Sequence, residues 1–284
     1  MKIGIIGNGF VGKATSLLEC SDVNIIVYDI NPKLCNPIGT TLNDIVLCEL
    51  IFISVPTPMN KDGSCHLDIL HSVIDEINNI KPVDELLIIN RCTVPIGSSN
   101  KINCFFMPEF LTEKNYKHDF VNNPDWIFGL KGKAIDVLFI EKIKLLINLS
   151  YKNKCINYNK IHFITNNEAE MVKLFKNNFL ATKIAFCNEI YQFTKTLDIN
   201  YETIRELSTR DPRIGSSHTN VPGHDGKLGF GGTCFPKDTN NLLYQMNEKK
   251  IKSYVIKSVV DRNEKVDRIE QDWKQDKNRA YISK

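Results

Sequence analysis

The sequence predicts an α/β fold, in which a doubly wound parallel sheet is followed by a helical domain. Two observations carry this prediction. In the first part of the 284-residue chain, short apolar runs typical of buried strands alternate with amphipathic stretches typical of helices. From about residue 167 onward, apolar residues recur every three or four positions, which is the period of a helix. We therefore expect two domains, residues 1–166 and residues 167–284.

The composition is that of an ordinary soluble globular protein, with 42% hydrophobic and 24% charged residues. A formal net charge of +3 and the lack of a compact Lys/Arg block argue against a nucleic-acid partner. No apolar run reaches transmembrane length, and residues 1–10 read as a strand rather than a signal peptide. We expect a cytoplasmic protein without a membrane partner.

The nine cysteines are scattered, and no Cys-x-x-Cys pair occurs among them. This pattern argues against a zinc site and against a disulfide framework, so we expect free thiols and no metal. Most of the thiols should be inert, small apolar residues. A thiol with a chemical role therefore has to be identified from its surroundings.

A glycine-rich turn follows the first predicted strand. "KIGII" (residues 2–6) leads directly into Gly-x-Gly-x-x-Gly at residues 7–12, and a helical stretch follows. The first glycine permits a tight turn, the second lets phosphates approach the backbone, and the third lets helix and strand pack closely. This order is that of a Rossmann-type dinucleotide site. The positions expected to line the cofactor are Gly7, Gly9, Phe10, Val11 and Gly12.

An acidic residue stands where the ribose of such a cofactor should lie. Asp29 comes at the end of the second predicted strand, "NIIVYDI". A carboxylate there accepts hydrogen bonds from both ribose hydroxyls and repels a 2′-phosphate, which favours NAD over NADP. A glycine-rich turn without a ligand would not explain Asp29.

Polar residues also follow the later predicted strands. Ligands bind at the carboxyl ends of parallel strands, so the loops at 91–97 and 108–113 should face the cofactor edge. Thr93, Glu109 and Glu113 lie in these loops. Each could equally be a solvated loop residue or a helix cap.

The second half is expected to contain one long helix of roughly seven turns. Lys173 and Asn177 are i,i+4 neighbours on one face of it, and the helix alone favours a solvent-exposed pair. An apolar stripe beside them is expected to pack in the core. Its members are Val172, Phe175, Phe179, Thr182, Phe186, Ile190 and Phe193.

The stretch "LGFGGTCFPKD" (residues 228–238) ends an irregular loop and begins a helix. Cys234 stands near the helix start and Asp238 in the first turns. Helix N-terminal amides and a nearby lysine both stabilise a thiolate, so this cysteine has surroundings suited to chemistry. A tight turn before a helix, with the cysteine as filler, is the alternative.

Five stretches in this order resemble the UDP-glucose/GDP-mannose dehydrogenase family: "GIIGNGFVG", "RCTVPIGS", "MPEFLTE", "EMVKLFKNNFLATKIAFCNEI" and "GFGGTCFPKD". The family oxidises a primary alcohol to a carboxylate with two NAD and without releasing the aldehyde. The form of the last stretch implies UDP-glucose as substrate and UDP-glucuronate as product. The alternatives are another sugar nucleotide (GDP-mannose or a UDP-N-acetyl sugar) and a non-catalytic NAD-binding remnant.

The resemblance also implies roles for individual residues. Cys234 would form a thiohemiacetal and then a thioester, which is hydrolysed to the uronic acid. Lys173 and Asn177 would stabilise negative oxygen, and Glu109 would activate the hydrolytic water. A water-positioning or proton-transfer role is implied for Asp238 and Thr93. Substrate contacts are implied for Glu109, Phe110, Leu111, Glu113, Lys173, Asn177, Arg213, Phe230 and Gly231.

Two expectations concern assembly. Family members typically carry a further C-terminal domain that covers the UDP, and this sequence ends where that domain would begin. We therefore expect the loop at 209–233 and a partner subunit, reached by Arg213, to supply part of the UDP site. Family members dimerise through the long central helix, so a homodimer is expected.

Overall fold

The computed structural model describes residues 1–276 and 279–282. The chain divides into two compact units, and the division falls inside one long helix, later than the expected boundary after residue 166. The first turns of that helix pack on the sheet, where Ala169 belongs to the core. The first unit is residues 1–57 and 67–173, and the second is residues 58–66 and 174–284.

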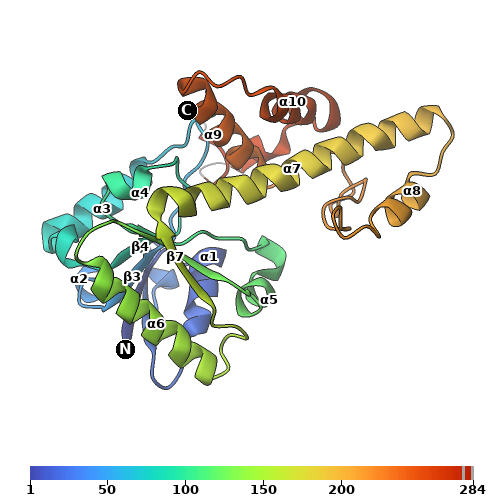
Figure 1. Cartoon of the computed structure of the whole chain (residues 1–284). Coiled ribbons are helices and arrows are strands. Elements are labelled where there is room, and N and C mark those ends of the chain that lie inside the picture. Colours follow the sequence, from blue (N-terminus) through green and yellow to red (C-terminus); the bar gives the residue numbers. More distant parts are fainter. Residues whose placement is uncertain (277–278, 283–284) are drawn as a thin grey trace. The chain divides into compact units, whose positions relative to one another are not determined.

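The first unit contains a seven-stranded sheet in the order β2-β1-β3-β4-β5-β6-β7 (Figure 1). Strands β1 to β5 are parallel to one another, whereas β6 pairs antiparallel with β5 and parallel with β7. The predicted α/β class with a mainly parallel sheet is confirmed. The strands are β1 (Lys2–Ile6), β2 (Asn24–Tyr28), β3 (Leu50–Ile53), β4 (Ile88–Asn90), β5 (Phe105–Phe106), β6 (Trp126–Leu130) and β7 (Ile161–Thr165).

Helices cover both faces of this sheet (Figure 1). On one face, α1, α5 and α6 share a core in which the rings of Phe105 and Phe139 stack with centroids 3.6 Å apart. On the other face, α2 and α3 bury Ile45, Leu70 and Ile77. The helices are α1 (Phe10–Thr15), α2 (Leu42–Ile45), α3 (Asp68–Ile80), α4 (Ser98–Lys101), α5 (Tyr116–Val121) and α6 (Asp136–Lys152).

The long predicted helix is confirmed as α7 (Asn166–Thr196), but the expectation that its aromatic stripe packs in the core is wrong. Phe175, Phe179, Phe186 and Phe193 are 61%, 58%, 64% and 60% exposed. The buried face of α7 carries small and polar side chains instead, because it holds the polar groups described below. The buried residues of α7 are Asn166, Ala169, Glu170, Lys173, Leu174, Asn177, Asn178, Ala181, Ala185, Asn188 and Thr194.

The second unit is helical. Phe230 and Val259 pack on Ala181 and Ala185 of α7 and form a small core. None of the helices in the described residues is long and apolar enough to cross a membrane. The remaining elements are α8 (Tyr201–Ser208), α9 (Phe235–Glu248), α10 (Tyr254–Arg262), the π-helical turn η5 (Asn263–Asp267) and the 3-10 turn η6 (Asp272–Gln275).

The segment 58–66 belongs to the second unit although it follows β3 in sequence. Met59 donates a backbone hydrogen bond of 2.9 Å to Ala280 and accepts one of 2.9 Å from Ile282. Its side chain is buried in a cluster with Trp273. These contacts, distant in sequence, could not be predicted from the local pattern.

Candidate active site

The glycine turn after β1 has the geometry that a dinucleotide site requires. Gly7 adopts a φ of +93°, and a Cβ there would lie 2.5 Å from the carbonyl oxygen of Ser54. A Cβ at Gly12 would lie 1.9 Å from the carbonyl oxygen of Gly7, so this close packing also requires glycine. At Gly9, by contrast, a Cβ would meet nothing within 4 Å. Open space therefore lies beside the start of α1, where a pyrophosphate would approach.

Asp29 follows β2 and is fixed beside this turn. Its carboxylate accepts hydrogen bonds of 2.8 Å from the backbone N–H of Asn8 and 2.9 Å from that of Asn31. A carboxylate oriented by two amides, next to open space at a glycine turn, fits the ribose of NAD. Gly9 and Asp29 would thus hold the two parts of the cofactor that the sequence assigns to them.

A buried ion pair joins the loop after β5 to α7. The ammonium of Lys173 lies 2.9 Å from Oε2 of Glu109, and these side chains are 4% and 6% exposed. Lys173 also donates to the carbonyl oxygen of Glu109, and its ammonium lies 5.8 Å from the ring centroid of Phe110. The other carboxylate oxygen accepts from the backbone N–H of Leu111. The expectation of a solvent-exposed Lys173 is therefore wrong.

Arg91 is a second buried cation near Glu109, and the sequence prediction did not include it. Burial lowers its pKa to about 10, and the charge of Glu109 acts in the opposite direction. Its guanidinium donates to the hydroxyl of Thr15 and to the carbonyl oxygen of Val11, the latter at 3.4 Å. Arg91 therefore links the end of β4 to α1. An arginine directly after a buried strand was the available signal.

Two other predicted residues of the first unit have different surroundings. Thr93 is half-buried, and its carbonyl oxygen accepts a hydrogen bond of 2.8 Å from the hydroxyl of Thr57. Glu113 is exposed at the first residue of the 3-10 turn η4 (Glu113–Asn115).

A second buried polar group lies within the second unit. Asn177 on α7 donates a 2.5 Å hydrogen bond from Nδ2 to Oδ2 of Asp238, whose side chain is fully buried. The ammonium of Lys237 lies 2.7 Å from the other carboxylate oxygen. Asn178 donates to the backbone carbonyl of Asp238 at 3.2 Å. The fold therefore brings the predicted site residues Asn177 and Asp238 into direct contact. The expectation that Asn177 is exposed to solvent is wrong, as it is for Lys173.

Lys237 is a further candidate residue that the sequence prediction did not include. It is buried, and burial lowers its pKa, but the charge of Asp238 and the negative charges of Cys65 and Cys234 as thiolates outweigh this effect and raise the pKa. A cation therefore persists near the Cys234 thiol. The signal was the spacing Cys-x-x-Lys-Asp at a helix start, which places residues i, i+3 and i+4 on one face.

Cys234 is the N-cap residue of α9 and is half-buried. Its carbonyl oxygen accepts the first helical hydrogen bond, 2.9 Å long, from the backbone N–H of Asp238. Pro236 follows within the first turn, a position that suits proline because the first amides of a helix have no helical acceptor. Cys234 therefore stands at the positive end of a 14-residue helix, a position at which helix amides favour a thiolate.

The remaining predicted contacts lie in the loop before Cys234. Arg213 has a side chain that is 88% exposed and pairs with Asp211 at 2.6 Å. Phe230 is 4% exposed and packs its ring in the core with Val259. Gly231 lies directly against a buried arginine, described below. In this chain the ring of Phe230 serves the packing of the loop.

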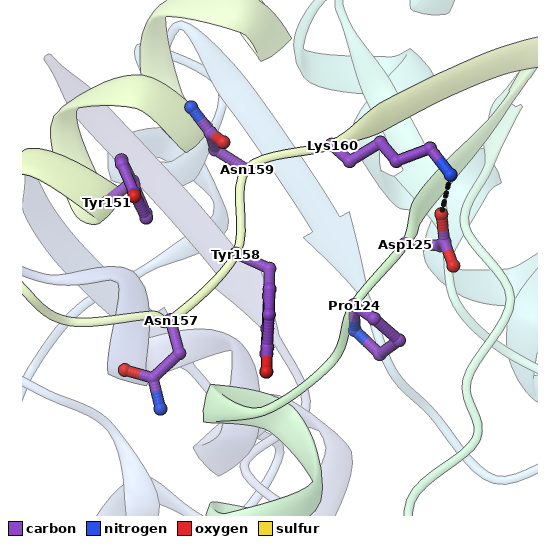
Figure 2. Close-up of a pocket in the computed structure, with 7 residues that line it drawn as sticks. All are labelled: Pro124, Asp125, Tyr151, Asn157, Tyr158, Asn159 and Lys160. Carbon is purple, nitrogen blue, oxygen red and sulfur yellow. Dashed lines mark ion pairs between the residues drawn. The ribbon is translucent and has the colours of Figure 1, made fainter.

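A surface cavity of about 310 Å³ in the first unit lies in the segments that precede β6 and β7 (Figure 2). Figure 2 shows the ammonium of Lys160 paired with Asp125, at 3.0 Å. No predicted site residue is among the residues that line it. These are Pro124, Asp125, Tyr151, Asn157, Tyr158, Asn159 and Lys160.

Among the residues that the structure describes, no group of three or more His, Cys, Asp or Glu side chains is placed to hold a metal ion. All nine cysteines are free thiols.

The sheet and the glycine turn beside Asp29 place the chain in the class of Rossmann-type, dinucleotide-dependent oxidoreductases. Comparison with known families narrows the class. The NAD binding domain of the UDP-glucose/GDP-mannose dehydrogenase family matches residues 38–143, and the central domain of the same family matches residues 167–265. The chain belongs to the UDP-glucose/GDP-mannose dehydrogenase family, and its cofactor is NAD.

Individual relatives agree with this assignment. The chain is 29% identical over 301 residues to the UDP-glucose 6-dehydrogenase of Campylobacter jejuni, covering 93% of this chain and 72% of that protein. It is 30% identical over 226 residues to the UDP-glucose 6-dehydrogenase of Rickettsia prowazekii, covering 76% of this chain but only 49% of that protein. The chain thus spans between about half and about three quarters of these two relatives.

Solved structures share the fold. A UDP-glucose dehydrogenase from Pyrobaculum islandicum superposes with a TM-score of 0.75 at 23% identity, covering 91% of this chain and 67% of that one. A UDP-D-ManNAc dehydrogenase from Pyrococcus horikoshii gives a TM-score of 0.71 at 21% identity, covering 92% and 67%. The two scores are similar, so the fold does not discriminate between their sugars.

Proposed function

We propose that the protein catalyses the NAD-dependent, four-electron oxidation of UDP-glucose to UDP-glucuronate through a covalent adduct on Cys234. The observation that carries this proposal is the buried group at the start of α9. There, the carboxylate of Asp238 is held between Asn177 and Lys237, next to the cysteine. Burying two charges is costly, and a cation and carboxylate beside a helix-capping thiol are the surroundings that nucleophilic catalysis requires.

The cofactor supplies the hydride acceptor for both oxidations. The chain contributes the open space at Gly9, which admits the pyrophosphate, and the carboxylate of Asp29, which accepts hydrogen bonds from the ribose. These groups bind and orient NAD. They take no part in proton transfer.

The first oxidation converts the primary alcohol to an aldehyde: the hydride goes to NAD and the hydroxyl proton to a water that we assign to Asp238 and Thr93, so a partial negative charge develops on the reacting oxygen during the step. Lys173 is the group that we assign to stabilise this charge, with Asn177 one turn later on the same helix as a hydrogen-bond donor. The ammonium of Lys173 is already fixed by Glu109, so little reorganisation is needed when the charge develops.

Cys234 then retains the aldehyde. Its thiolate adds to the carbonyl carbon to give a thiohemiacetal, and loss of a second hydride leaves a thioester. The Lys237 ammonium and the N-terminus of α9 both favour the thiolate. Water then cleaves the thioester, and the products are the carboxylate and the free Cys234 thiol.

Hydrolysis needs a base, and we assign it to Glu109, with Asp238 and Thr93 positioning the water. Both oxygens of Asp238 already accept hydrogen bonds, which suits a positioning role. Oε2 of Glu109 lies 2.9 Å from the Lys173 ammonium, so the proposed base stands beside the group that we assign to the reacting oxygen.

The long helix suggests how two chains associate. Phe175 and Phe179 are exposed on α7 with parallel rings 6.3 Å apart, and Phe186 and Phe193 continue the stripe. An exposed aromatic stripe on a helix is typical of a surface that another protein covers. We propose that α7 pairs with its copy in a homodimer, and that the exposed Arg213 contributes to the partner's nucleotide site.

A substrate panel tests this function. Purified protein is incubated with NAD and, separately, with UDP-glucose, GDP-mannose or a UDP-N-acetyl sugar, and NADH formation is followed. We expect the highest kcat/KM with UDP-glucose. A higher kcat/KM with another sugar nucleotide would mean that this sugar nucleotide, and not UDP-glucose, is the preferred substrate. NAD binding without turnover of any of them would support the non-catalytic alternative.

A further inference from the structure

The segment just before Cys234 is held by the π-helical turn η5. Asn263 accepts a 2.8 Å hydrogen bond from the backbone N–H of Phe230 and donates one of 2.9 Å to its carbonyl oxygen. The π geometry is marked by an i→i−5 bond of 2.8 Å from the N–H of Arg268 to the carbonyl of Asn263. The widened turn therefore brings Asn263 and Arg268 to the same segment.

Arg268 is 3% exposed and binds two carboxylates. Its Nε and Nη2 donate to the two oxygens of Asp272 at 3.0 and 2.8 Å. Nη2 also donates to Asp225 at 2.5 Å, and Nη1 donates to the carbonyl of Leu228 at 3.4 Å. The guanidinium thus ties the start of the segment to η6, with a planar fork that few other side chains reproduce.

Gly231 lies directly against this guanidinium. A Cβ at Gly231 would lie 2.6 Å from both Cζ and Nη2 of Arg268 and 2.8 Å from Nε. The backbone of Gly231 does not have a positive φ, so an alanine would not be strained by its own conformation. The glycine is therefore required by the position of Arg268 and by no feature of its backbone.

We propose that Arg268 is a positioning residue for the sugar nucleotide. Its guanidinium fixes residues 228–232 in one conformation, and this proposal rests on the proposed function, in which this segment borders the substrate. A segment with three glycines loses much conformational entropy when it is ordered. Because Arg268 orders it before substrate binds, the loss of Arg268 raises KM more than it lowers kcat.

A double-mutant cycle tests the contact. Gly231→Ala, Arg268→Ala and the double variant are compared for KM and kcat with the best sugar nucleotide of the panel. We expect each single variant to raise KM about tenfold with kcat changed less than about threefold. Removing the guanidinium also removes the clash with a Cβ at residue 231. In the Arg268→Ala background, Gly231→Ala should therefore raise KM by less than about a further twofold. Arg268→Lys keeps the positive charge but lacks the planar guanidinium. We expect its KM to lie between those of wild type and Arg268→Ala.

A second readout does not depend on activity. Hydrogen exchange of the peptide containing residues 223–233 is measured by mass spectrometry, with Lys144→Ala at an exposed position of α6 as control. Arg268→Ala is expected to speed exchange in this peptide at least about tenfold, while Lys144→Ala leaves it unchanged. If Arg268→Ala does not fold, Arg268→Lys replaces it in both experiments.

The proposal is overturned if Gly231→Ala is equally harmful in both backgrounds, or if exchange of the peptide is unaffected by the loss of Arg268. If the wild-type protein oxidises none of the sugar nucleotides, the proposed function fails. The exchange experiment then still decides whether Arg268 fixes the segment.

Discussion

Asn177 and Asp238, 61 residues apart in sequence, are joined by a 2.5 Å hydrogen bond that is fully removed from solvent. The bond ties the central turns of α7 to the first turn of α9. Since Asp238 also holds the ammonium of Lys237, one carboxylate organises the polar groups beside Cys234. Polar groups buried in this way cost stability unless every partner is present.

Replacement of Asp238 by Asn should therefore be severe. The variant leaves the buried Lys237 without a counter-charge, so we expect it to lose about 3 kcal/mol of unfolding free energy and most of its turnover. Asp261→Asn is the control, because Asp261 pairs with Lys257 and Lys265 near the surface, and it should cost less than about 1 kcal/mol. Urea denaturation measures both. Equal losses in the two variants would contradict the assigned role of Asp238.

Asp29 should control the choice of cofactor. Asp29→Asn removes the negative charge while keeping the shape, and we expect KM for NAD to rise about tenfold to 100-fold as charged hydrogen bonds to the ribose weaken. The preference for NAD over NADP should fall at the same time. The exposed Asp75 on α3 gives the control Asp75→Asn, with unchanged kinetics. An unchanged NAD/NADP ratio in Asp29→Asn would show that another residue selects the cofactor.

The exposed aromatic stripe of α7 predicts the assembly state. We expect the wild-type protein to have the mass of two chains by light scattering. Phe179→Arg with Phe186→Arg places two charges in the proposed interface and should weaken the dimer at least about 100-fold, giving the mass of one chain. Ile251→Arg, at an exposed apolar residue outside α7, should leave the mass unchanged. A wild-type mass of one chain would contradict the proposed interface.

The ion pairs of Arg268 predict a loss of stability in acid. Hydrogen bonds from Arg268, and then from Lys227, lower the pKa of Asp272 to about 2 against the effect of its burial. Because the folded pKa lies below the unfolded one, the contribution of Asp272 is complete above about pH 4 and disappears as the pH falls toward 2. Water screens part of this pair, so we expect about 1 kcal/mol.

Asp272→Asn checks this contribution by denaturation at two pH values. At pH 6 the variant should be less stable than wild type by that amount, and near pH 2.5 the difference should fall to less than about half of it. Glu206→Gln, exposed on α8, should show no such difference at either pH. A gap that is the same at both pH values would mean that Asp272 acts through packing and not through its charge.

Local patterns predicted the elements well because the relevant physics is local. The glycine turn, the strand periodicity and the position of Asp29 all depend on residues within a few positions of one another. The same holds for Cys234 at the start of α9. The helix α7 was also predicted correctly in type, since its period of three to four extends over many turns, but its 31 residues exceed the roughly seven turns expected.

The prediction for the faces of α7 was wrong for a physical reason. An apolar stripe ordinarily marks the buried face, but here the buried face carries Lys173, Asn177 and Asn178, each with a hydrogen-bond partner. The partners Glu109 and Asp238 are distant in sequence. Periodicity therefore could not show that polar groups take the interior and leave the Phe175 stripe outside.

The pairings of Lys237, Arg91 and Arg268 were missed for the same reason. Each is a buried cation whose carboxylate or carbonyl partners come from the three-dimensional arrangement of loops. A single sequence shows the charge and not its partner. Lys237, adjacent to Asp238, had a signal in its own spacing, and Arg91 had one in its place directly after a buried strand.

The central claim is that Cys234 holds the substrate between two oxidations, and the ratio of NADH formed to UDP-glucose consumed tests it most directly. The account predicts two NADH for each UDP-glucose, a uronate product and no free aldehyde. Steady-state turnover should be lost in Cys234→Ser. One NADH per sugar with released aldehyde, or a Cys234→Ser variant as active as wild type, would contradict the covalent role of Cys234.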